Sequence, residues 1–208
     1  MQTIGNFLPL CNKVLYFPSS REPLSSDIFL IMTERFPILF DVGNGSAALS
    51  AALFVKDPVV VLSHFHADHV GNIAALSPSA LYLTRFTQKH TVPGTVVTAS
   101  TEITDGITVF PFPNSHSKGS LALKAGSMLF IGDALYPGTL NERACYNTGL
   151  LREEIDFIKQ TAPTDVIVSH RKNPVVSTAA VLAFLEGIYR LRAPNETYIF
   201  TKTPFSGE

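Results

Sequence analysis

The feature that most constrains this chain is that its histidines follow apolar, strand-like runs. The chain has six histidines, and five of them lie at or just after the point where such a run ends. His64, His66 and His69 follow Val59–Ser63, His116 follows Ile107–Phe112 through a short turn, and His170 follows Val166–Ser169; only His90 does not fit the pattern. A rigid sheet can direct several strand-end loops to one point. The pattern therefore predicts one convergent site on a sheet-based fold.

The segment His64-Phe65-His66-Ala67-Asp68-His69 carries four metal-binding side chains within six residues, directly after a fully apolar β-branched run. Such a group is costly to bury unless a cation compensates it. In an extended segment, residues two apart point the same way, so His64 and His66 can bind one metal together. A helix that begins near Asp68 would direct Asp68 and His69 to a second position. Taken alone, His116 or His170 fits an ordinary histidine better than a ligand.

The pattern of apolar runs predicts an α/β fold with two packed sheets and helices outside them. Val70, Ile73, Ala74 and Leu76 are expected to form a buried helical face, with Gly71 allowing close approach. The predicted strands are Lys13–Phe17, Asp27–Thr33, Ile38–Val42, Val59–Ser63, Leu81–Thr84, Thr95–Thr98, Ile107–Pro111, Leu121–Lys124, Met128–Ile131, Val166–Ser169 and Tyr198–Phe200, the last at an edge. The predicted helices are Ala47–Phe54, with Ser46 as N-cap, Leu150–Gln160 and Thr178–Leu191.

Length and charge restrict the domain number and the partners. The 208 residues suit a single domain over 1–208. Sixteen Lys and Arg against seventeen Asp and Glu give a net charge of −1, which predicts neither a nucleic-acid nor a membrane partner and favours a small-molecule substrate. Cys11 and Cys145 are expected to be free thiols in a reducing compartment, and Met1–Asn6 has no secretory pattern. A cytoplasmic protein is the expectation.

The motifs in this chain resemble those of the metallo-β-lactamase superfamily. His64–His69 matches the HxHxDH signature of that family, and four further motifs follow the same order. These are Asp41-Val42-Gly43, Ser115-His116 with Gly119-Ser120, Gly132-Asp133 and Ser169-His170. The resemblance implies a four-layer αββα sandwich of two mixed β-sheets flanked by helices, with the metals at one edge.

The resemblance also implies a ligand set for two metals, expected to be zinc, with iron or manganese also suited to imidazole and carboxylate donors. His64, His66 and His116 would bind the first metal. Asp68, His69 and His170 would bind the second, and Asp133 would bridge the two. Asp41 would hold a ligand histidine by a hydrogen bond; as a strand-end residue before Gly43, it fits an ordinary turn equally well.

The implied activity is hydrolysis of a small ester, thioester or lactone by a metal-bridging hydroxide. Asp68 or Asp133 would move the proton, and the sequence does not choose between them. Tyr136, three residues after Asp133, resembles the tyrosine of acyl-homoserine lactonases and could donate to the oxyanion; packing under the loop is the competing interpretation. Charged residues near the motifs could meet an anionic substrate, although solvated surface charge fits them better: Lys118, Arg143, Arg171 and Lys172.

Two other classes of function compete with hydrolysis. Persulfide dioxygenases share the HxHxDH motif but bind one iron, so a mononuclear-iron oxidoreductase is the main alternative. A non-catalytic binding module with the same fold is the other. His66 stands where the redox di-iron members have Glu, and Asp133 stands where true β-lactamases have Cys or Ser. His170-Arg171-Lys172 replaces the His-Gly of many thioesterase-type members, which puts that branch in doubt.

Overall fold

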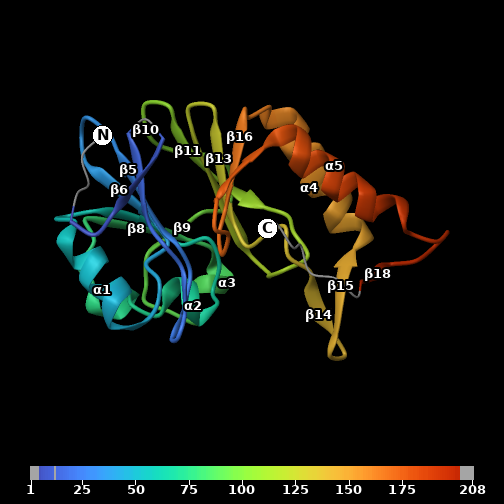
Figure 1. The fold of residues 1–208 in the computed structure, drawn as a ribbon, viewed down its shortest axis with the longest axis horizontal. Helices are drawn as coiled ribbons and strands as arrows, with labels where there is room; N and C mark the ends of the chain where they lie inside the picture. Colours follow the sequence, from blue (N-terminus) through green and yellow to red (C-terminus); the bar gives the residue numbers. More distant parts are fainter. Residues whose placement is uncertain (1–4, 12, 202–208) are drawn as a thin grey trace. The chain divides into compact units, whose positions relative to one another are not determined.

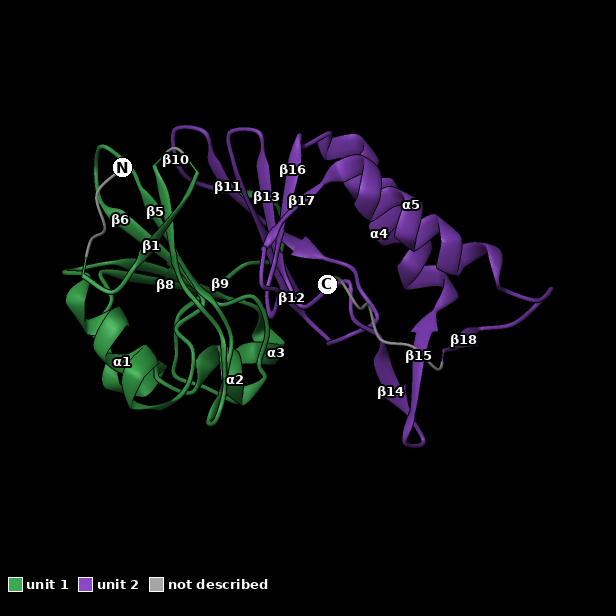
Figure 2. Cartoon of the chain, viewed as in Figure 1, with its two compact units in different colours: residues 1–101 green, residues 102–208 purple. Residues whose placement is uncertain are grey.

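The computed structural model describes residues 5–11 and 13–201. They divide into two compact units, Met1–Thr101 and Glu102–Glu208, which Figure 2 draws in different colours. The expectation of a single domain stays a prediction. Of the N-terminal segment Met1–Asn6, most lies outside the described residues. No helix within 5–11 and 13–201 is both long and apolar enough to cross a membrane.

The first unit contains a mixed seven-stranded sheet in the order β1-β2-β5-β6-β7-β8-β9. Neighbours from β1 to β6 are antiparallel, and neighbours from β6 to β9 are parallel. The strands are β1 (Leu8–Cys11), β2 (Val14–Phe17), β5 (Ile28–Met32), β6 (Pro37–Phe40), β7 (Val59–Val61), β8 (Ala80–Leu83) and β9 (Thr95–Val96), with a separate hairpin of β3 (Ser20–Arg21) and β4 (Leu24–Ser25). Because β6 and β7 are parallel, their carboxyl ends lie at the same edge of the sheet.

Three helices lie on one side of this sheet (Figure 1): α1 (Gly45–Phe54), α2 (Ala67–Val70) and α3 (Arg85–Gln88). Alanines of α1 and Val70 of α2 share a core cluster with the apolar side chains of the strands. The predicted N-cap of α1 is wrong, because the helix begins at Gly45 with Asn44 as its cap. Asn44 makes no side-chain capping bond, since its amide donates to the Leu24 carbonyl at 3.2 Å.

The helical face predicted after the HxHxDH segment is only partly present. Val70 and Ile73 are buried, as expected, but Ala74 is exposed. The reason is that α2 ends at Val70 and a 3-10 turn follows over Ile73–Ala75, which changes the helical period. The close approach expected at Gly71 is confirmed, because a Cβ there would lie 2.6 Å from the Asn44 side-chain oxygen.

The second unit contains a six-stranded sheet in the order β10-β11-β12-β13-β16-β17 and a three-stranded sheet in the order β14-β15-β18. In the larger sheet β13 and β16 are parallel, whereas β11-β12, β12-β13 and β16-β17 are antiparallel. The strands are β10 (Thr101–Thr104), β11 (Ile107–Phe112), β12 (Ser120–Ala125), β13 (Met128–Gly132), β14 (Gly138–Leu140), β15 (Arg143–Asn147), β16 (Asp165–Val168), β17 (Val175–Ser177) and β18 (Tyr198–Phe200). The edge position predicted for Tyr198–Phe200 is confirmed.

Two amphipathic helices, α4 (Thr148–Thr161) and α5 (Thr178–Arg190), lie together on one side of the larger sheet (Figure 1). Each begins at a side-chain cap: Asn147 accepts from the Leu150 amide at 3.0 Å, and Ser177 accepts from the Ala180 amide at 3.3 Å. Their apolar faces bury Ile158 and Leu185 in one cluster with strand residues. The predicted α/β class, with mixed sheets flanked by helices, is therefore confirmed.

The buried face of α4 carries an ionisable residue, Glu154, whose side chain is fully buried. Neither carboxyl oxygen has a hydrogen-bond partner among the described residues, and burial raises the pKa of Glu154 well above its ordinary value of 4.5. The folded protein therefore keeps this proton at pH values where the unfolded chain has lost it. Its contribution to stability is present below pH 4.5 and is lost as the pH rises towards the folded-state pKa.

We expect Glu154→Leu to stabilise the fold at pH 8 by roughly 1–3 kcal/mol, the usual penalty of a buried polar group without a partner. The gain should shrink as the pH falls towards 4.5. Urea unfolding at pH 5 and pH 8 measures both effects. Glu153→Leu, at the exposed neighbouring position of the same helix, is the matched control. A gain that does not depend on pH would show that Glu154 is not the titrating group.

Candidate metal centre

The first half of the candidate site lies where β6 and β7 end. Phe40 of β6 pairs with Val61 of β7, so the residues that follow these strands, Asp41 and Ser63, reach the same edge. The Ser63 amide donates to Asp41 Oδ1 at 2.7 Å, and the Ser63 hydroxyl donates to Asp41 Oδ2 at 2.7 Å. Asp41 and Ser63 are both fully or almost fully buried. This pair also contacts His64 and His69 of the HxHxDH segment.

The backbone at Asp41 is held in the left-handed region, with φ at +62°. This region is uncommon for residues other than glycine, although Asp and Asn enter it more readily than most. The conformation turns the chain at the end of β6 and leaves the carboxylate directed at Ser63 and His69. His69 Nδ1 lies 2.7 Å from Asp41 Oδ2. The predicted hydrogen bond between Asp41 and a motif histidine is therefore present, while the role of His69 as a metal ligand stays a prediction.

These hydrogen bonds determine which ring nitrogens can bind a metal. The single proton of the Ser63 hydroxyl is donated to Asp41, so His64 Nδ1, 2.9 Å away, must donate its own proton to Ser63 Oγ. His69 Nδ1 likewise donates to the Asp41 carboxylate. A neutral imidazole that donates through Nδ1 carries its lone pair on Nε2. Both Nε2 atoms are therefore set up as ligands, as metal-bound histidines require.

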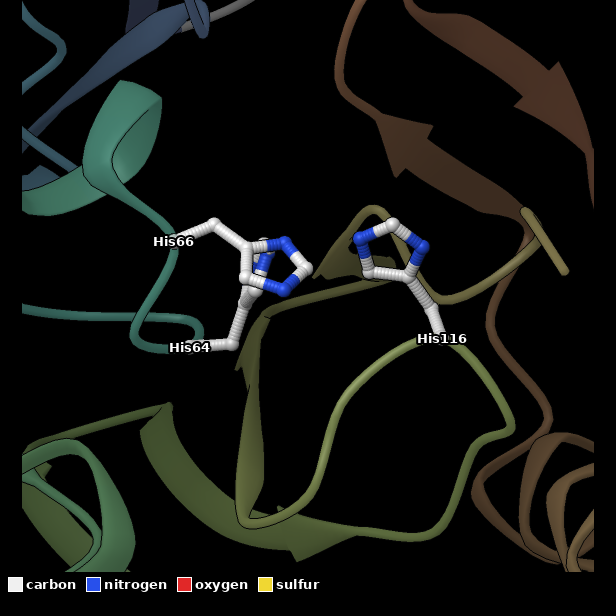
Figure 3. Close-up of side chains that lie close together, drawn as sticks. All are labelled: His64, His66 and His116. Atoms are coloured by element: carbon white, nitrogen blue, oxygen red, sulfur yellow. Dashed lines mark hydrogen bonds between the residues drawn. The ribbon is translucent and has the colours of Figure 1, made fainter. Parts of the chain in front are cut away.

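His64 and His66 lie against each other, and Figure 3 shows their imidazoles side by side. His64 Nε2 is 3.0 Å from His66 Nδ1, so residues two apart do direct ring nitrogens to one place. Two ring nitrogens this close can share one proton or bind one cation. On the other side of the segment, α2 begins at Ala67 and brings Asp68 Oδ2 to 3.6 Å from His69 Nε2. The segment thus presents two separate donor pairs.

The second half of the candidate site lies where β13 and β16, which are parallel, end. The Ser169 amide donates to the Gly132 carbonyl at 3.1 Å, which ties the two strand ends together. Asp133 directly follows Gly132, and His170 directly follows Ser169. The backbone of His170 is in the left-handed region, with φ at +62°. Asp133 Oδ2 lies 3.6 Å from His170 Nε2. The parallel pair in the second unit therefore repeats the arrangement of β6 and β7 in the first.

His116, also drawn in Figure 3, comes from the loop after β11. Its Nδ1 donates to the Pro137 carbonyl at 3.3 Å, so its lone pair lies on Nε2. That Nε2 is 3.6 Å from Asp133 Oδ2, the same oxygen that approaches His170. Gly138 makes the loop position possible, since a Cβ there would overlap the Ser115 carbonyl oxygen. One carboxylate oxygen thus lies within reach of two histidines.

Two tyrosines hold the loop that carries Asp133. The Tyr136 hydroxyl donates to the Ser169 carbonyl at 2.9 Å, next to His170, and the Tyr146 hydroxyl donates to the Leu135 carbonyl at 2.7 Å. Burial and the nearby Glu154 raise the pKa of Tyr146, which stays protonated. Since a phenol has one proton, Tyr136 could donate to an oxyanion only by giving up Ser169. Its role as an oxyanion donor stays a prediction.

The remaining candidates lie on the surface or make local contacts. Lys118 and Lys172 are exposed, Arg143 lies over the Phe200 ring at 3.9 Å, and Arg171 Nε is 3.4 Å from the Asn173 carbonyl. Ser63 is the functional residue that sequence reasoning did not single out. Its position immediately before the first ligand histidine was the available signal, because a hydroxyl there can reach both a neighbouring strand end and an imidazole.

This chain has the metallo-β-lactamase fold, and it carries an HxHxDH sequence at His64–His69 within that fold. A metallo-β-lactamase from Hirschia baltica is 18% identical, with a TM-score of 0.64 over 86% of this chain and 95% of that chain. An archaeal metallo-β-lactamase superfamily protein from Sulfolobus tokodaii is 15% identical, with a TM-score of 0.60 over 86% of each chain. No family model and no curated protein matches the sequence.

The similar structures include different chemistries. A chemotaxis sensor, described as a peroxy diiron species, is 15% identical to this chain, with a TM-score of 0.66 over 90% of this chain and 96% of that chain. At these identities the likeness shows the fold and leaves the reaction open. The donors fit a metal on their own chemistry, since three imidazoles have Nδ1 engaged in hydrogen bonds, which leaves the lone pair on Nε2. The donor set is therefore suited to binding a metal.

Proposed function

We propose that this protein is a dinuclear metallohydrolase that cleaves a small ester, thioester or lactone. The observation that carries the proposal is the position of Asp133, whose Oδ2 lies 3.6 Å from both His116 Nε2 and His170 Nε2. A carboxylate oxygen between two imidazoles suits a bridge between two cations. A set of imidazole and carboxylate donors suits zinc, and also iron or manganese.

The proposed ligands form two sets that share Asp133. His64, His66 and His116 would make the first set, and Asp68, His69 and His170 would make the second. Under this proposal the first unit would contribute His64, His66, Asp68 and His69, and the second unit would contribute His116, His170 and the bridging Asp133. The proposal is supported by the hydrogen bonds at Nδ1 of His64, His69 and His116, because they leave Nε2 of each ring as the nitrogen that can bind a metal.

Bound cations would supply Lewis-acid polarisation of a carbonyl and a water whose pKa is lowered to about 7. Residues of the chain would transfer the proton and hold the ligands in position. Asp68, part-exposed beside His69, and Asp133, nearly buried, are the two carboxylates able to accept and pass on a proton. The Ser63–Asp41 pair keeps His64 and His69 from rotating. Tyr136 would contribute a hydrogen bond only if it exchanged its Ser169 partner.

The experiment that tests this proposal loads the protein with zinc, iron or manganese and measures bound metal by mass spectrometry. We expect two equivalents of zinc and turnover of at least one substrate in panels of thioesters, lactones and carboxylic esters. A phosphodiester panel tests a different hydrolase class. One equivalent of iron with oxygen uptake would instead support the mononuclear-iron oxidoreductase, and metal binding without any turnover would support a binding module.

The substrate and the location belong to the same proposal. A nearly neutral chain suits a small-molecule substrate better than nucleic acid or a membrane surface. We propose a cytoplasmic location, because Cys11 and Cys145 are both free thiols. Growth of cells that produce the protein, followed by fractionation, tests the location.

A further inference from the structure

An aromatic cluster lies directly beside the HxHxDH segment and includes His90, the one histidine outside the strand-end pattern. The Phe65 ring stacks on the His90 ring, with centroids 4.7 Å apart and planes 29° apart. Phe86 completes the cluster, at 5.1 Å from Phe65 and 5.3 Å from His90. We call Phe65, Phe86 and His90 the aromatic shelf. All three lie in the first unit, so the shelf is defined within one unit.

The shelf is continuous with the proposed metal ligands. Phe65 stands between His64 and His66 in the chain, and its ring meets the His66 ring edge to face at 4.7 Å. In the aromatic shelf, Phe65 and Phe86 are half-buried and His90 is exposed. Open aromatic surface next to a reaction centre is where the apolar part of a ligand gains most by leaving water.

Local hydrogen bonds hold His90 in position. Thr84 is the N-cap of α3, and its hydroxyl accepts from the Thr87 amide at 3.2 Å. The His90 amide then donates to the Thr87 carbonyl at 3.0 Å, and the Thr91 hydroxyl donates to the same carbonyl at 3.0 Å. The exposed His90 ring is therefore presented by an ordered turn.

We propose that the aromatic shelf binds an alkyl or aryl group of the substrate and makes the enzyme selective for apolar acyl groups. The inference rests on the proposed function and narrows its substrate class. Ring faces attract apolar chains without directional demands, so a straight-chain or aromatic acyl group fits better than a polar peptide-like one. Each methylene that the shelf covers should raise kcat/KM by up to roughly fourfold.

The test compares ethyl acetate, ethyl butanoate and ethyl hexanoate, followed by proton release, in the zinc-loaded full chain. We expect kcat/KM to rise with chain length in the natural sequence. In His90→Ala and Phe86→Ala, the preference for hexanoate over acetate should fall roughly tenfold, because hexanoate loses more contact than acetate, and the zinc content should be retained. His90→Phe keeps a ring over Phe65 and should keep the preference. Phe54→Ala, an aromatic residue of α1 with 55% exposure, is the matched control.

Two results would overturn the proposal. An equal loss on all three esters would show that the cluster only holds His66, and an unchanged preference in both alanine variants would show that the substrate does not touch it. A second measurement does not need turnover: hexan-1-ol, but not propan-1-ol, should shift the ring proton resonances of His90. If no ester is cleaved, the proposed function fails, and the titration alone then tests whether the aromatic shelf binds apolar groups. Absence of a shift with hexan-1-ol would contradict such binding.

Discussion

Asp133→Ala is expected to abolish hydrolysis and to reduce the bound zinc from two equivalents to one or none. The substitution removes the one oxygen that lies within 3.6 Å of both His116 Nε2 and His170 Nε2. A bridging ligand contributes to both metals at once, so its loss should cost more than the roughly 10–100-fold that loss of a supporting group causes. Metal analysis and kcat/KM on any substrate from the panels measure the two effects.

The fold should survive Asp133→Ala, because β13 and β16 are held by their own ladder and by the Ser169–Gly132 hydrogen bond. Circular dichroism and the urea midpoint check this. Asp105→Ala, at an exposed turn of the same unit, is the control and should keep full metal content. Two equivalents of zinc together with normal turnover in Asp133→Ala would exclude a bridging role for this residue.

Asp41→Asn is expected to lower zinc affinity and kcat/KM by roughly 10–100-fold without any change in a metal ligand. Asparagine tolerates the left-handed backbone at this position, and its side-chain oxygen can still accept from the Ser63 amide. Its NH₂ group, however, then faces the N–H of His69 Nδ1, which now lacks an acceptor. We expect His69 to move its proton to Nε2 and so to lose the lone pair that the metal needs.

Competition with a chromophoric chelator measures the affinity, and nitrogen-15 chemical shifts of the His69 ring report the tautomer. The tautomer is the decisive readout, because a general loss of stability would leave it unchanged. Asp57→Asn is the matched control: it makes the same exchange at an exposed aspartate with φ at +47°. Retention of the natural His69 tautomer in Asp41→Asn would show that Asp41 does not act through this hydrogen bond.

The positions of many strands along the chain and of the motif residues could be predicted from the sequence, because both depend on local patterns. Val59–Val61 is buried on both faces, and its β-branched run is typical of such a strand. The helices α4 and α5 follow from their apolar period of 3.6 and lie within two residues of the predicted ends. The HxHxDH segment is itself local, so its extended start and its helical end at α2 were both predictable.

Short strands with little apolar pattern were not predicted, and tertiary pairing explains them. β14 and β15 pair with each other, and β15 also pairs with β18, so each is stabilised by a partner distant in the chain or by a tight turn. β17 is a strand because it pairs with β16. Such segments gain their hydrogen bonds only when the partner strand is in place, and runs of three to five residues are too short for an apolar pattern to predict them.

By itself, the sequence determined the chemical types of the donors and their places at strand ends, because side-chain chemistry and the alternation of a strand are properties of neighbouring residues. Only the tertiary structure decided which ring nitrogen each histidine offers and which carboxylate oxygen lies between His116 and His170. Those choices depend on hydrogen bonds between residues far apart in the chain, such as Asp41 with His69 and His116 with Pro137. Packing of separate segments creates these bonds, and spacing along the chain does not encode them.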